Sequence, residues 1–123
     1  MKPEALQSLS IFELVGLYVK AAQAYGQARE EAKPRVANKQ SDLVVTLRKE
    51  FRRRGHEGHA AMARLMTHES GWVRLMAAGF TLHISPTEAE PVLEALTQLA
   101  GECGFSASTI LDLWRRRELK PPE

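Results

Sequence analysis

The sequence predicts an all-α fold, and three observations support this prediction. Apolar residues recur at the helical spacing of three and four, and no stretch alternates apolar and polar residues for long enough to indicate a strand. Helix start and stop signals recur along the chain. The 123 residues are 44% hydrophobic and 26% charged, an ordinary globular composition. We expect one domain over residues 1–123, with about six helices arranged as stacked antiparallel hairpins.

Residues 10–54 predict a leading helical hairpin. A long first helix begins where Ser10 and Glu13 form a capping box. Pro34 disfavours helical geometry at the residue before it, so the first helix breaks there and the second follows. Gly55 suits the position just past the end of the second helix.

Residues 56–119 predict a series of shorter helices. The third covers roughly residues 59–66. The fourth, within residues 71–82, is apolar on nearly all sides, which indicates a central, buried helix.

The last two helices have start signals of their own. Ser85 followed by Pro86 is typical of a helix N-terminus. Pro91 then leaves two alternatives, because a helix either begins there after a separate turn or is kinked there. The sixth helix is expected to open at Ser106, with Phe105 in a hydrophobic staple.

Positive charge is concentrated in the first half. Residues 1–54 carry eleven Lys/Arg against six Asp/Glu, whereas residues 55–123 carry six against nine. A basic half can dock an acidic partner, although a solvated helix face gives the same pattern. The candidate partner-binding residues are Arg48, Arg52 and Arg53 in the first basic cluster, and Trp114, Arg115 and Arg116 in the second.

Two segments resemble a known family. Val73–Arg74, Ala77–Ala78 and Leu82 are similar to the inner helix of a HEAT-type repeat. The segment GFSASTILDLWRRREL, residues 104–119, resembles the C-terminal part of a small uncharacterised bacterial family, a domain of unknown function with a HEAT-like fold.

The resemblance implies a HEAT-like helical domain, with residues 10–54 as a leading hairpin and residues 56–119 as HEAT-like hairpins. It supplies no catalytic residues. The arginine of such a Val-Arg pair commonly meets an acid, so Arg74 is expected to be structural and to pair with Glu69, or else with Glu94 or Glu102. Some short HEAT-like bacterial proteins are immunity partners of toxins, which is an analogy of fold alone.

Metal and catalytic motifs are weak. His56 and His59 are three residues apart, but the HExxH spacing is missing and no Cys or Asp cluster completes a ligand set. Cys103 is the one cysteine, so an intramolecular disulfide is excluded. We expect it at the end of a helix, where the helix dipole disfavours the reactive thiolate. We therefore expect no catalytic, metal-binding or cofactor-binding residues and no cofactor. The N-terminus lacks a signal-peptide pattern and no apolar run is long enough to span a bilayer, which favours the cytoplasm.

These observations favour a non-catalytic protein-binding module of a bacterial cytosol, such as an immunity or adaptor protein bound to a toxin or another protein. The anchors to seek are exposed aromatic side chains among Phe12, Tyr18, Tyr25 and Trp114. The alternative is nucleic-acid binding through the two arginine clusters, which the nearby acids and the net charge of +2 disfavour. An enzyme is the least supported class.

Overall fold

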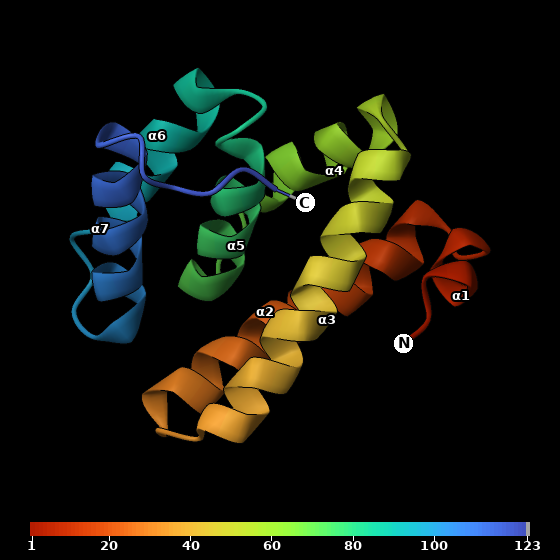
Figure 1. Cartoon of the computed structure of the whole chain (residues 1–123), viewed down its shortest axis with the longest axis horizontal. Helices are drawn as coiled ribbons and strands as arrows, with labels where there is room; N and C mark the ends of the chain where they lie inside the picture. The colour runs from red at the N-terminus through yellow and green to blue at the C-terminus, as the bar shows by residue number, and fades with distance from the viewer. Residues whose placement is uncertain (123) are drawn as a thin grey trace. The chain divides into compact units, whose positions relative to one another are not determined.

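The structure, a computed structural model, describes residues 1–122 and is all-helical over that range. This confirms the predicted fold class. Two compact units are present, Met1–Ala61 and Met62–Glu123 (Figure 1). The helices are α1 (Pro3–Gln7), α2 (Ile11–Glu30), α3 (Pro34–Arg53), α4 (His56–Leu65), α5 (Gly71–Thr81), α6 (Pro86–Leu96) and α7 (Glu102–Arg115).

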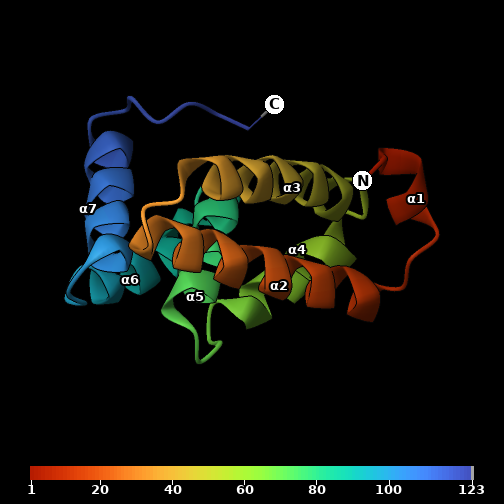
Figure 2. The ribbon, with the colours of Figure 1, turned by 90° about the horizontal axis from the view of Figure 1, so that it is seen from below.

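The first unit is built on the hairpin of α2 and α3, which run side by side (Figure 2). The short turn between them makes the two helices antiparallel neighbours. Tyr18 of α2 and Phe51 of α3 are fully buried and meet edge to face, with ring centroids 5.5 Å apart. Leu14 and Leu47, also fully buried, extend this core along the two helices.

The boundaries of the hairpin follow local chemistry. The Ser10 hydroxyl accepts the Glu13 backbone N–H, and the Glu13 carboxylate accepts the Ser10 backbone N–H, so the predicted capping box is confirmed. Pro34 occupies the first turn of α3, where a missing N–H costs nothing. Gly55, at φ 61°, adopts the left-handed conformation that ends α3, as predicted.

α1 was not predicted from the sequence. This five-residue helix starts at Pro3 and places Leu6 in the core with no exposed surface. Its one buried side chain gives too little periodicity for a sequence pattern to reveal.

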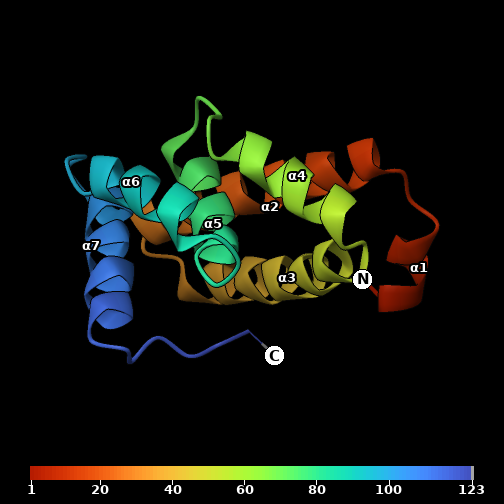
Figure 3. The same ribbon diagram turned by 90° about the horizontal axis from the view of Figure 1, so that it is seen from above.

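The second unit contains α5, α6 and α7. α5 packs against α6, α7 packs against both, and Figure 3 shows α6 and α7 side by side. Val73, Ala77 and Ala78 of α5 are fully buried, which agrees with the prediction of a central, apolar helix. None of the helices in residues 1–122 combines the length and apolarity needed to cross a bilayer.

The predicted helix start at Ser85–Pro86 is confirmed, whereas the predicted start of α7 requires correction. α6 runs without interruption from Pro86 through Pro91, so Pro91 does not begin the helix, and the Ser85 side chain makes no capping hydrogen bond. α7 begins at Glu102, one turn before Ser106, because the buried stripe of Cys103, Ala107 and Leu111 starts there. Phe105 is consequently 67% exposed instead of forming a staple.

Candidate functional site

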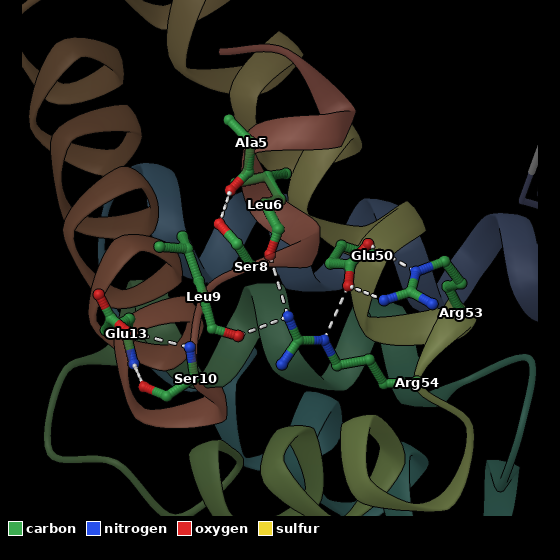
Figure 4. Close-up of polar contacts among 9 residues, drawn as sticks. All are labelled: Ala5, Leu6, Ser8, Leu9, Ser10, Glu13, Glu50, Arg53 and Arg54. Atoms are coloured by element: carbon green, nitrogen blue, oxygen red, sulfur yellow. Dashed lines mark hydrogen bonds and ion pairs between the residues drawn. The ribbon is translucent and has the colours of Figure 1, made fainter.

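The first basic cluster, on α3, is partly neutralised inside the fold. Arg53 donates to both carboxylate oxygens of Glu50, at 2.9 and 2.8 Å, and Arg54 Nε donates to Glu50 Oε2 at 2.7 Å. Arg54 Nη2 also donates to the backbone carbonyls of Leu6 and Leu9, at 3.0 and 2.7 Å (Figure 4). These contacts fasten α1 and the start of α2 to the end of α3. Arg54 is therefore engaged in holding the first unit together, and Arg53 binds the same Glu50 carboxylate from within α3.

The Glu50 carboxylate is the acceptor at the centre of this cluster and is only 5% exposed. The hydrogen bonds from Arg53, and then those from Arg54, hold the pKa of Glu50 below its ordinary value despite burial. The side chain is thus charged at neutral pH, and its charge is matched by the two guanidinium groups.

Arg48 and Arg52 lie one turn apart on α3. Arg48 Nε donates to the Tyr18 hydroxyl at 2.8 Å, and burial raises the pKa of Tyr18. Burial and the neighbouring Arg48 lower the pKa of Arg52. Tyr18 is fully buried, so it cannot serve as the exposed anchor for which it was a candidate.

The second basic cluster, at the end of α7, is also paired in part. Arg115 Nη2 lies 2.6 Å from Glu94 Oε1, which joins α7 to α6. Arg116 lies 3.0 Å from Asp112 and 3.3 Å from Glu118. Of the predicted partner-binding residues, Trp114 and Arg115 line one pocket, whereas Arg116 does not.

That pocket, here called the Trp114 pocket, has a volume of about 540 Å³ and lies within the second unit. The Trp114 ring meets the His83 ring edge to face, with centroids 5.4 Å apart. Acidic, basic and apolar side chains complete its lining, which consists of His83, Glu90, Trp114, Arg115, Arg117, Leu119 and Pro121.

Arg117 contributes to the pocket from an unusual backbone position. Its N–H donates to the Trp114 carbonyl at 3.0 Å, and the Glu118 N–H donates to the Leu113 carbonyl at 2.8 Å. This is the Schellman motif that ends many helices, in which the residue at positive φ is usually glycine. Arg117 takes that place with φ 59°. An L-residue is held there at a cost of about 1–2 kcal/mol.

Arg74 lies at the start of α5. The prediction that it pairs with a carboxylate is wrong for the described residues, because its acceptors are backbone carbonyls. Arg74 Nη1 donates to the backbone carbonyls of His68 and Glu69, at 2.7 and 2.9 Å. Glu69 therefore takes part through its main chain, and its side chain is exposed. Glu94 pairs with Arg115 instead. A guanidinium donates to the carbonyls of a turn as readily as it donates to a carboxylate. The sequence alone could not distinguish these two kinds of acceptor.

His56 and His59 both lie in the first turn of α4. Within residues 1–122 no group of three or more His, Cys, Asp or Glu side chains is arranged to hold a metal ion. Cys103 lies in the first turn of α7, at the opposite end of a helix from the one expected, and is buried.

The fold and the pocket together define a small all-helical protein with a mixed aromatic and charged site in its second unit. The chain belongs to the DUF2019 family, a domain of unknown function, which it matches over residues 12–114. It is similar to the crystal structure of the protein RPA1889 from Rhodopseudomonas palustris CGA009, with a TM-score of 0.84 and 25% sequence identity. The similarity covers 94% of this chain and 97% of that one. The comparison with curated proteins gave no match.

Five of the pocket residues were not among the predicted partner-binding residues: His83, Glu90, Arg117, Leu119 and Pro121. The positive φ of Arg117, at a position where glycine normally ends a helix, cannot be recognised from its residue type. His83 and Glu90 come from α6 and the segment before it, so only the packing of α6 against α7 brings them to Trp114.

Proposed function

We propose that this chain is a non-catalytic protein-binding module that holds a partner at the Trp114 pocket. The observation that supports this proposal is the pocket itself, where a half-buried indole is bordered by charged side chains. Tryptophan and arginine in partly desolvated positions are the side chains most often found at the energetic centre of protein interfaces.

The open wall of the pocket favours a protein partner over an enclosed small molecule. Arg115, Arg117 and Pro121 are exposed, so one side faces solvent. Small-ligand sites usually bury most of the ligand surface. A peptide segment that lies across the pocket and inserts one side chain suits this shape better.

Nucleic acid is the weaker alternative. Arg53, Arg54, Arg115 and Arg116 all have carboxylate partners within the chain, which reduces the positive charge available to phosphates. The Trp114 pocket also contains Glu90, whose charge would repel a polyanion.

A narrower form of the proposal is an immunity or adaptor protein in a bacterial cytosol, built on a HEAT-like scaffold. Stacked helical scaffolds of this kind present extended surfaces to partners. A toxin gene directly upstream of the gene for this chain would support the immunity role, and unrelated neighbouring genes in several genomes would argue against it.

The proposal is tested by affinity capture from cells of the source organism, with the full chain as bait. We expect wild type and Phe105→Ala to recover the same protein, and Trp114→Ala to lose it. Phe105 is the matched control because it is an exposed aromatic on α7 that does not line the pocket. The recovered protein is then purified, and its direct binding is measured by calorimetry.

Two results would count against the proposal. Equal capture by all three baits would place the interaction elsewhere, provided that circular dichroism shows Trp114→Ala to be folded. Loss of the captured material after nuclease treatment would favour the nucleic-acid alternative.

A further inference from the structure

The pocket contains two opposite charges that do not meet. Arg117 and Glu90 both line it, yet within residues 1–122 no hydrogen bond or ion pair joins them. Arg115, in contrast, is held by Glu94 at 2.6 Å. Among the described residues, the Arg117 guanidinium is therefore the cation of the pocket that is available to a ligand.

The backbone conformation of Arg117 also supports a role in binding a ligand. Glycine would occupy this left-handed position with less strain than arginine does. Strained backbone positions are concentrated at functional sites, where a side chain is needed in a fixed place. Here the strained residue carries the one cation of the pocket without a described partner.

The same motif elsewhere in the chain provides a comparison. Ala32 ends α2 at φ 55°, with its N–H donating to the Arg29 carbonyl and the Lys33 N–H donating to the Ala28 carbonyl. The two helix ends thus share one backbone geometry, but Ala32 lines no part of the Trp114 pocket. The two single variants Arg117→Gly and Ala32→Gly both relieve backbone strain, but only Arg117→Gly also removes the Arg117 side chain. Their comparison therefore separates the two effects.

Resting on the proposed function, we infer that the Trp114 pocket takes a partner segment in which a single carboxylate stands next to an apolar side chain. The carboxylate binds Arg117, and the apolar side chain packs on Trp114 and Leu119. A bidentate guanidinium–carboxylate pair gives directional recognition. Glu90 disfavours a second negative charge, which separates this ligand from a polyphosphate or an acid-rich tail.

The test uses two synthetic tetrapeptides, acetyl-Gly-Asp-Phe-Gly-amide and acetyl-Gly-Asn-Phe-Gly-amide, which differ only in the carboxylate. Binding to the full chain is followed by the NMR signals of the indole N–H groups. Trp114 reports the pocket, and Trp72, which is buried in α5, serves as an internal reference.

For wild type we expect the Trp114 signal to shift, with at least about tenfold preference for the Asp peptide. Arg117→Gly should bind both peptides equally and should melt at a temperature about 2–5 °C higher. Ala32→Gly should also gain thermal stability, while it keeps the preference for the Asp peptide.

Three outcomes would overturn the inference: equal binding of both peptides by wild type, an unmoved Trp114 signal, or a preference that survives in Arg117→Gly. These results are separable from the test of the proposed function. A partner lost in Trp114→Ala but fully bound by Arg117→Gly overturns only the carboxylate inference. Peptide discrimination without any Trp114-dependent partner overturns only the proposed function.

Discussion

Arg54 Nε lies 2.7 Å from Glu50 Oε2, and the exposed fractions of the two side chains are 11% and 5%. The same guanidinium reaches the carbonyls of Leu6 and Leu9, so one buried ion pair orders the chain from α1 to the start of α2. Loss of Arg54 would leave the two carbonyls without this donor and Glu50 with Arg53 as its remaining guanidinium, whereas loss of Glu50 would leave the Arg54 charge without a carboxylate.

Arg54→Ala is expected to lower the free energy of unfolding by about 3–5 kcal/mol, because it removes the buried guanidinium that binds both the Glu50 carboxylate and the carbonyls of Leu6 and Leu9. Arg53→Ala is the matched control, since Arg53 binds the same carboxylate but is 52% exposed. Its expected cost is below about 1 kcal/mol. Urea unfolding followed by circular dichroism measures both, and equal losses would contradict the importance of burial.

Acid should weaken the same cluster. The pKa of Glu50 is lowered in the folded chain, mainly by the Arg53 hydrogen bonds, so the carboxylate contributes stability above its unfolded pKa of about 4.3. That contribution is lost as the pH falls through the lower, folded value. Glu50→Gln should therefore melt at a lower temperature than wild type at pH 7, with the difference narrowing at about pH 3. A difference that does not change with pH would rule out the charge of Glu50 as its source.

The contacts of Arg74 agree with its predicted structural role but assign no part in it to the Glu69 carboxylate. Arg74→Ala should reduce the free energy of unfolding by about 1–3 kcal/mol, because two carbonyls lose a charged donor. Glu69→Gln should change it by less than about 0.5 kcal/mol, since only the main chain of Glu69 accepts. Thermal melts of the two variants decide the matter, and a large effect of Glu69→Gln would restore the carboxylate pairing.

Gly104 marks a close approach between α7 and the segment before it. A Cβ at this position would lie 1.8 Å from the Leu99 carbonyl oxygen, so the backbone must move to admit a methyl group. Gly104→Ala is expected to cost about 3 kcal/mol or more. Gly16→Ala, in the exposed middle of α2 with no atom within 4 Å of the new Cβ, should instead stabilise by about 0.5–1 kcal/mol. Denaturant midpoints compare the two, and a mild effect at Gly104 would contradict the packing.

The predictable parts of the fold were those with local causes. The capping box at Ser10 and the left-handed Gly55 depend on neighbouring residues, and both were found as expected. The start of α7 depended on tertiary packing, which outweighed the local signal at Ser106. The spacing of Cys103, Ala107 and Leu111 would have indicated the earlier start.

The candidate site was only partly predictable for a similar reason. Trp114 and Arg115 stood out as an aromatic residue within a basic cluster. His83 and Glu90 became neighbours of Trp114 only through the folding of α6 against α7. Arg117 was not among the candidates, because its backbone conformation cannot be recognised from residue type.

The division into two units also separates the intrinsic chromophores. Both tryptophans, Trp72 and Trp114, belong to the second unit, whereas both tyrosines, Tyr18 and Tyr25, belong to the first. Indole fluorescence therefore follows the melting of the second unit, and the tyrosine near-ultraviolet signal follows that of the first. Cys103, buried in α7, adds a thiol whose alkylation rate measures the opening of the second unit. The cooperativity of the whole molecule can thus be measured without introducing a single probe.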